Sequence, residues 1–281
     1  MRLFGRSKSR KRLDEVLQSH QPPTFPQGVM RLLKLLRDPN AEVRDIAAAL
    51  SWDPGLVVRV LKLVNSAAFG RTQHIDSVQH AVTMLGRSQL EQIVLGVAVR
   101  DNLPRTPARG FEPRRFWRAA FFRASLASAF ADVIHPAEQA RSFIGALLQD
   151  MAVPLLAHAR PVDYCDVLES WHRAADSELH VLEKQALGFS HDEIGGHLGT
   201  EWELPESLTR VIELHHHDEA SDSQLPPALR LVALHRETER EHGIDAMVEN
   251  ARHMYGLKPD WTRLAVQQSD EQATELAQSL A

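Results

Sequence analysis

The sequence predicts an all-α protein, and three observations lead to this prediction. From Gln27 onward, apolar residues recur every three or four positions almost without interruption, as they do on the buried side of amphipathic helices. No segment alternates apolar and polar residues with the period of two that indicates a half-buried strand. Residues 103–113 contain three prolines and a glycine between two helical stretches, which marks a boundary. We therefore expect one helical subdomain over residues 20–102 and a second over residues 114–217.

Composition and charge narrow the class of protein. The chain has 281 residues, of which 43% are hydrophobic and 25% charged, as in an ordinary soluble globular protein. A formal net charge of −5 does not favour DNA as a partner. The single cysteine, Cys165, excludes an internal disulfide, and the neighbouring Asp166 disfavours a reactive thiolate. Because no apolar run approaches the ~20 residues of a membrane span and no signal-peptide pattern occurs, the expected location is the cytoplasm.

The first residues form a basic segment. Six basic residues and no acidic ones lie between Arg2 and Arg12. Chain ends usually fray, so residues 1–19 are expected to be a flexible, solvated tail. Contact of this tail with an acidic membrane surface is the open alternative.

Within residues 20–102, each expected helix has a recognisable start or end. An apolar stripe from Val29 to Leu36 forms the first helix, and Asn40 is the expected cap of the second. Asp53 and Pro54 open the third, since an acceptor at the N-cap and a proline in the first turn favour a helix start. The third helix is expected to end at Asn65–Ser66. The fourth is expected to start at Ser77 and end at Gly86, and a last helix is expected from Leu90 to Val97.

The second half is also read as helices. The expected elements are a long helix from Arg114 to Ile134, a buried helical passage from Phe143 to Leu156 broken at Pro154, helical structure from Tyr164 to Leu187 ending at Gly188, a helix opened by a Ser190–Glu193 capping box, and a helix starting at Pro205. Residues 218–281 form a C-terminal extension with further helices over Leu229–His242 and Asp260–Ala281.

One motif carries a family resemblance. A D-P-x-L helix start runs into N-S-x-x-F-G within residues 53–70, and this combination resembles the HDOD family, the HD-related output domains. The resemblance spans about residues 20–217 and implies a helical subdomain followed by a degenerate HD-like bundle. It also implies a bacterial regulatory module that acts through protein–protein contacts, often in pathways linked to cyclic di-GMP. The signature residues are Asp53, Pro54, Asn65, Ser66, Phe69 and Gly70, and we expect Phe69 to plug the joint between helices.

The resemblance also implies where an HD-type metal site would lie. Such sites use a His, a His-Asp pair, further histidines and a late Asp, which hold divalent metal. Here Ala119 and Gln149 stand at two expected histidine positions. The late Asp is also missing, because the sequence around His235 does not match the expected motif. The matching residues that remain are Asp150, His191, His215 and His216. We therefore expect a vestigial site with no metal, no cofactor and no catalysis.

Two alternatives to a purely protein-binding module stay open. The former cleft could serve as a receptor for a nucleotide such as cyclic di-GMP, with Arg118, Arg123 and Arg141 contacting phosphates. A metal-dependent phosphohydrolase with one ion held by Asp150 and the histidines is less favoured, because the two lost imidazoles are central ligands. The sequence names no partner protein.

Overall fold

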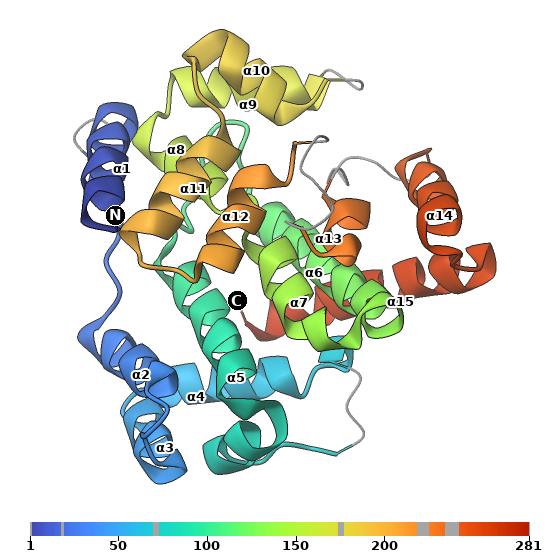
Figure 1. The fold of residues 1–281 in the computed structure, drawn as a ribbon. Helices are drawn as coiled ribbons and strands as arrows, with labels where there is room; N and C mark the ends of the chain where they lie inside the picture. Colours follow the sequence, from blue (N-terminus) through green and yellow to red (C-terminus); the bar gives the residue numbers. More distant parts are fainter. Residues whose placement is uncertain are drawn as a thin grey trace.

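The computed structural model describes residues 2–17, 20–69, 73–173, 177–217, 225–233 and 242–280, with the side chains of residues 2–9 and 242 excepted. The described residues contain no β-strand, only an isolated bridge between Ala108 and Phe111. The all-α prediction is thus confirmed (Figure 1). The elements are α1 (Arg2–Leu17), α2 (Gln27–Arg37), α3 (Val43–Ser51), α4 (Pro54–Val64), η1 (Ala67–Phe69), α5 (Val78–Asn102), α6 (Pro113–Ile134), η2 (Pro136–Glu138), α7 (Gln139–Leu148), α8 (Ala152–Ala159), α9 (Asp163–Arg173), α10 (Leu179–Leu187), α11 (His191–Glu201), α12 (Glu206–Leu214), α13 (Pro227–Val232), α14 (His242–Tyr255) and α15 (Pro259–Ser279).

Helix α5 connects two groups of helices. Helices α2, α3 and α4 pack around α5 at one end of the molecule, and α6 to α12 form the larger bundle at the other (Figure 1). The expected end of a helix at Gly86 corresponds to a kink inside α5, where Gly86 has φ +74°. Glycine reaches this conformation without the steric penalty that a side chain would add. The kink therefore separates a short first part of α5 from the long part that reaches the bundle.

The signature residues shape the corner between α4 and α5. Asp53 caps α4 by accepting the Leu56 N–H at 2.9 Å, and Pro54 stands in the first turn. The Asn65 side chain bonds both backbone groups of Ile75, each at 2.7 Å, and so closes the corner. The Ser66 hydroxyl donates to the carbonyl of Leu63, and Gly70 lies outside the described residues.

Phe69 joins this corner to the larger bundle. Its side chain is buried, and its ring centre lies 4.9 Å from that of Phe143 in α7. The hydroxyl of Ser128 in α6 donates to the carbonyl of Ala68 at 2.6 Å. The corner is thus held against both α6 and α7.

Two expected caps are wrong in detail. Glu42, not Asn40, precedes α3, and it makes no capping hydrogen bond with its side chain. Ser190 does precede α11, but its side chain does not cap the helix. The carboxylate of Glu183 accepts the His191 N–H at 2.7 Å, so a distant residue has taken over the capping role.

The expected helices differ from the observed ones at two further places. The passage expected to break at Pro154 instead breaks at residues 149–151, and Pro154 lies in the first turn of α8. Proline is tolerated there because a first-turn N–H has no acceptor within the helix. The helix expected over Leu229–His242 ends at Val232, residues 234–241 lie outside the described part, and α14 was not predicted.

The expected flexible tail is the largest difference. Residues 2–17 form α1, which packs against α11, and Leu13, Val16 and Leu17 are buried. These three residues recur at helical spacing, which allows one side of α1 to enter the core. Arg10 pairs with Glu201 at 2.7 Å beside them. The basic segment is therefore part of a docked helix.

Substituting Leu13 tests this docking. Because the side chain is fully buried, Leu13→Ala should lower the free energy of unfolding by about 2–5 kcal/mol in a chemical denaturation experiment. Arg10→Gln is the control, since a surface ion pair contributes little and its loss should hardly shift the curve. Equal stability of the two variants and the parent would show that the segment is not docked.

One stretch has the composition of a membrane span. Pro136–Ala159 is long and apolar enough by hydropathy, but 89% of its apolar window is buried inside the protein. The stretch comprises η2, α7 and α8 rather than a single helix. It thus corresponds to the centre of the helical bundle.

The C-terminal helix lies along the bundle. Helix α15 packs on α6, where the ring centres of Trp261 and Phe130 are 6.0 Å apart. Arg118 of α6 pairs with Asp270 at 2.5 Å, and Lys62 of α4 donates to the carbonyl of Ser279. The extension therefore touches both helical groups.

Candidate functional site

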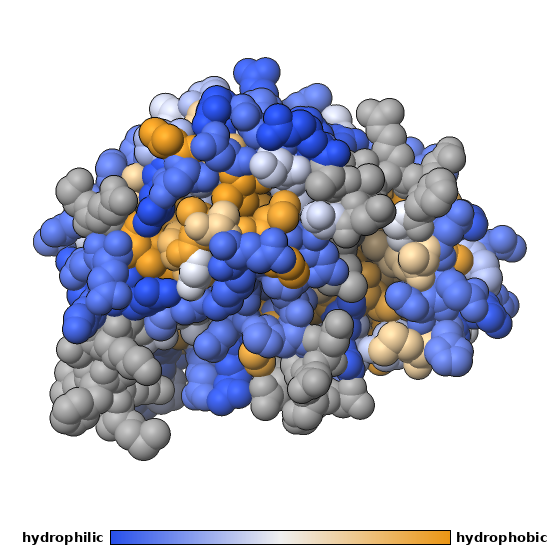
Figure 2. Space-filling view, turned by 90° about the horizontal axis from the view of Figure 1, so that it is seen from above, coloured by the Kyte–Doolittle hydropathy of each residue, from blue (hydrophilic) through white to orange (hydrophobic). Residues whose placement is uncertain are grey.

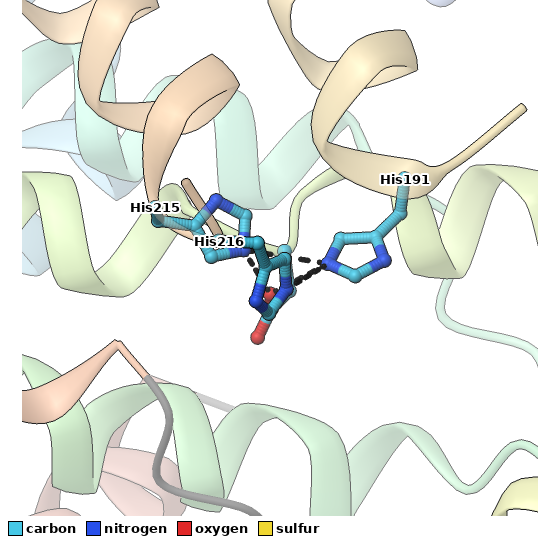
Figure 3. Close-up of side chains that lie close together, drawn as sticks. His191, His215 and His216 are labelled. Atoms are coloured by element: carbon cyan, nitrogen blue, oxygen red, sulfur yellow. Dashed lines mark hydrogen bonds and ion pairs between the residues drawn. The ribbon is translucent and has the colours of Figure 1, made fainter. Parts of the chain in front are cut away.

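Three histidines and one aspartate converge in the larger bundle. His191 is the first residue of α11, and His215 and His216 directly follow α12. Asp150 lies in the turn between α7 and α8. Figure 3 shows the three imidazole rings pointing toward one another from these two helices. The structure therefore brings together four of the six positions that the resemblance to HD-type sites implied.

The donor atoms of this cluster are close together. His191 Nε2 lies 3.1 Å from His216 Nε2 and 3.3 Å from His215 Nε2. Asp150 Oδ1 lies 3.2 Å from the Nε2 atoms of both His191 and His215. Each residue thus directs one donor atom at a common point.

Neighbouring groups fix the orientation of two rings. Glu183 Oε2 lies 2.7 Å from His191 Nδ1, and the carbonyl of Ile212 lies 2.8 Å from His215 Nδ1. A ring that donates its Nδ1–H in this way has, when neutral, a lone pair on Nε2. Carboxylate and carbonyl partners of this kind typically orient histidines that bind metal.

Glu183 and Tyr164 form a buried support that the sequence analysis missed. Glu183 is fully buried and accepts from the Tyr164 hydroxyl at 2.6 Å as well as from the backbone and ring of His191. Burial, and then the charge of Glu183, raise the pKa of Tyr164 well above its ordinary value. Tyr164 thus remains a hydrogen-bond donor. Nothing in the spacing of these residues pointed to their meeting.

The charges in the cluster favour a positive group at its centre. Burial alone would raise the pKa of Asp150, but the Arg123 guanidinium and hydrogen bonds from His191 and His215 hold it well below its ordinary value. Burial alone would lower the pKa of His191, but Glu183 and Asp150 raise it well above the ordinary value. Burial, and then the neighbouring histidines, lower the pKa of His216. The carboxylates of Glu183 and Asp150 therefore favour positive charge at the ring of His191, supplied by a proton or by a metal ion.

The four donor atoms fit one metal ion. With bonds of about 2.0–2.1 Å, the ligand atoms of a tetrahedral site lie about 3.3 Å apart, close to the separations of 3.1–3.3 Å measured here. All four donor atoms lie within 4.8 Å of one another. His216 thus completes a set of four possible ligands, whereas the sequence analysis expected a vestigial site with no metal.

A second group at the rim fits an ion less well. Glu178, His180 and His216 also bring donor atoms within 4.8 Å of one another. However, the rings of His180 and His216 are stacked, with centres 4.2 Å apart and planes inclined by 19°. Imidazole lone pairs lie in the ring plane, so two stacked rings do not direct them at one point. We therefore restrict the metal fit to the first cluster.

The other two positions implied by the resemblance supply no ligand. Ala119 lines the cleft with its methyl group. Gln149 is buried, and its amide donates to the carbonyl of Ala233 at 3.2 Å. Asp150 Oδ2 is held by the guanidinium of Arg123. The late position near His235 lies outside the described residues.

A cleft of about 740 Å³, including its open mouth, adjoins the cluster. Residues of α9 and α10 form one wall of the cleft. Figure 2 views the molecule from the side on which these two helices lie, and it shows a hydrophobic area surrounded by hydrophilic residues. Phe111, Phe116 and Trp171 line the cleft together with Arg123.

The structure does not bring the three expected phosphate-binding arginines together. Arg123 alone of the three lines the cleft. Arg118 pairs with Asp270 on α15, and Arg141 pairs with Glu138 at 3.1 Å. Of the expected set, only Arg123 therefore lies at the cleft, while Arg118 and Arg141 pair with residues elsewhere.

Cys165 lies outside the cleft lining. It is buried, and burial raises the pKa of its thiol, with Arg109 opposing and Asp166 adding to the effect. The interpretation that it is no nucleophile agrees with this direction, although burial contributes more than the adjacent carboxylate.

The fold and the cluster together define an all-α protein with a buried cluster of histidines and an aspartate. The sequence matches the HDOD domain over residues 23–218, and the chain therefore belongs to the HDOD family. It is also 28% identical over 222 residues to an uncharacterized protein of Treponema pallidum (strain Nichols). The match covers 78% of this chain but only 42% of that relative, so the chain spans less than half of its length.

Solved structures share the fold. A protein of Shewanella amazonensis SB2B whose suggested activity is that of a phosphohydrolase has a TM-score of 0.71 at 21% identity, covering 99% of this chain and 98% of its own. An HDOD domain protein of unknown function from Geobacter sulfurreducens has a TM-score of 0.65 at 19% identity, covering 99% and 97%. A protein of Marinobacter aquaeolei VT8 with a suggested role in signal transduction has a TM-score of 0.67 at 18% identity, covering 98% and 66%.

Proposed function

We propose that this chain is a regulatory HDOD module of bacterial signalling, located in the cytoplasm, which acts through contacts with other proteins and does not hydrolyse phosphoesters. One observation carries the proposal. The remaining HD-type residues form a closed set around one point, and Arg123 occupies the free oxygen of Asp150.

The number of ligands supports a non-catalytic role. A catalytic metal site keeps a coordination position open for water or substrate, whereas a structural site is closed by four protein ligands. Asp150, His191, His215 and His216 would supply all four. An ion bound there would supply positive charge that links the turn after α7 to α11 and α12.

The cation of Arg123 supports the same view. Its side chain is buried, and its charge lies beside Asp150. This charge would repel a second metal ion next to one held by the four ligands. Ala119 and Gln149 offer no imidazole to compensate. Among the described residues, the two positions that the resemblance assigns to histidines therefore add no ligand for a metal-bound water.

Assaying turnover tests the proposal. The full-length protein, supplied in turn with Mn²⁺, Fe²⁺ and Zn²⁺, should release no product from bis-p-nitrophenyl phosphate or cyclic di-GMP above a protein-free control. Turnover that grows with protein concentration and disappears in His191→Ala would overturn the non-catalytic assignment. It would instead support the phosphohydrolase function suggested for the Shewanella neighbour.

A nucleotide receptor is the second candidate, and one observation favours it. The buried Nε–H of Arg123 has no hydrogen-bond acceptor among the described residues, and it borders a cleft with aromatic walls. Calorimetric titration with cyclic di-GMP separates this candidate from a purely protein-binding module. Binding that is lost in Arg123→Gln but kept in Arg118→Gln would support the receptor, since Arg118 does not line the cleft and pairs with Asp270 of α15 instead.

A further inference from the structure

Three arginines converge on one carboxylate at a place away from the histidine cluster. Asp101 Oδ2 lies 2.6 Å from Arg59 Nε, and Asp101 Oδ1 lies 2.6 Å from Arg105 Nη2 and 3.2 Å from Arg100 Nη1. The three arginines come from α4, from the loop after α5 and from α5 itself. We name these four residues the Asp101 cluster.

The charges of the Asp101 cluster do not balance. Three guanidinium groups share one carboxylate, so two positive charges are left without a carboxylate partner among the described residues. Burial, and then the charge of Arg105, lower the pKa of Arg100 to about 10, with Arg59 adding to the effect. The arginines thus repel one another across Asp101, and an added anion would relieve this repulsion.

One buried N–H group of the cluster, on Arg100, lacks an acceptor among the described residues. Arg100 is only 4% exposed, with its guanidinium stacked 5.5 Å from the ring centre of Trp117 and 5.7 Å from that of Phe121. Its Nε–H has no hydrogen-bond acceptor in the described part of the chain. The Nε of Arg59, by contrast, lies 2.6 Å from Asp101 Oδ2 and has that carboxylate as its partner. An unsatisfied buried donor of a charged group is costly, so the free Nε–H of Arg100 points to a missing acceptor.

The cluster is accessible from solvent on one side. The side chain of Arg105 is 46% exposed and that of Arg59 is 31% exposed, while those of Asp101 and Arg100 are 17% and 5% exposed. A ligand can therefore approach over Arg105 and Arg59 and meet Arg100 at the base.

We propose that the Asp101 cluster binds a dianionic phosphate group, either free phosphate or the end of a phosphomonoester. A dianion matches the two uncompensated charges, and guanidinium groups bind phosphate oxygens through paired N–H donors. Bound there, the anion links α4, the end of α5 and the loop that leads to α6, which joins the first group of helices to the larger bundle. The site requires neither the histidine cluster nor the cleft.

Calorimetric titration of the full-length protein tests the site. Inorganic phosphate and glycerol 3-phosphate are the two probes, at an ionic strength held constant with chloride so that general screening does not change. Saturable binding of one phosphate group per chain is expected, and the tighter probe identifies whether the ligand is free or esterified.

Two matched variants locate the binding. Arg105→Gln should weaken binding about ten-fold or more, since it removes a charge-assisted donor. Arg109→Gln is the control: Arg109 lies in the same loop and is similarly exposed, but it pairs with both Asp166 and Glu169. Both changes are at exposed side chains, so folding should persist, as circular dichroism can verify. No saturable binding of either probe, or equal weakening by both variants, would overturn the proposal.

Discussion

Phe69→Ala should lower the free energy of unfolding by about 3–5 kcal/mol, as measured by chemical denaturation. Phe69 is 4% exposed and packs on Phe143, so its truncation leaves a cavity between the signature corner and α7. The backbone beside it is held by the Ser128 hydroxyl, which limits how far the corner can collapse into the cavity. The cost should therefore fall within the usual range for a buried phenylalanine.

Trp52→Ala is the matched control for this experiment. Trp52 is also aromatic and lies just before α4, but it is 80% exposed. Its truncation should change stability little, because it removes almost no buried apolar surface. A Phe69 variant as stable as the Trp52 variant would mean that the corner is not packed against the bundle.

Zn²⁺ should bind the dialysed protein at one ion per chain, and His215→Ala should abolish this stoichiometric binding. The expectation rests on the four converging donor atoms and on the Nδ1 contacts that orient His191 and His215. Free Zn²⁺ at a thousand times its dissociation constant should stabilise the fold by about 4 kcal/mol. Elemental analysis and thermal unfolding with and without Zn²⁺ measure the two effects.

The run of three histidines supplies its own control. His217 follows His216 directly, but its side chain is 57% exposed and faces Asp192. His217→Ala should bind Zn²⁺ as the parent does, whereas Glu183→Gln should bind about 10–100-fold more weakly, because Glu183 only orients a ligand. Absence of stoichiometric binding in the parent, or an equal loss in His217→Ala, would contradict a metal-binding cluster.

The parts of the fold that depend on local sequence could be predicted. Asp53 and Pro54 start a helix whatever surrounds them, because an N-cap acceptor and a first-turn proline act within one turn. The long helix expected from Arg114 to Ile134 is confirmed by α6. Basic residues hid the docking of α1, since their charge suggested solvation while Leu13, Val16 and Leu17 already had helical spacing.

The site depends on contacts between distant residues, and these could be predicted only in part. The resemblance indicated Asp150 and the histidines, but not that four donor atoms would meet within bonding distance of one point. The role of Glu183 could not be derived, since a carboxylate eight positions before His191 has no fixed geometry relative to it until α10 and α11 fold together. Arg123 was noted as a phosphate contact, whereas its partner in the structure is Asp150.

The packing of α15 on α6 has a consequence for synthesis of the chain. Helix α6 ends at Ile134, and its partner begins roughly 125 residues later at Pro259. At ~5–20 residues per second, the ribosome needs on the order of 10 s to make the intervening chain. During that interval the surface around Phe130, which later meets Trp261, has emerged without its cover. Nascent chains of this protein therefore pass through a stage at which a chaperone that binds apolar segments has a defined place to bind.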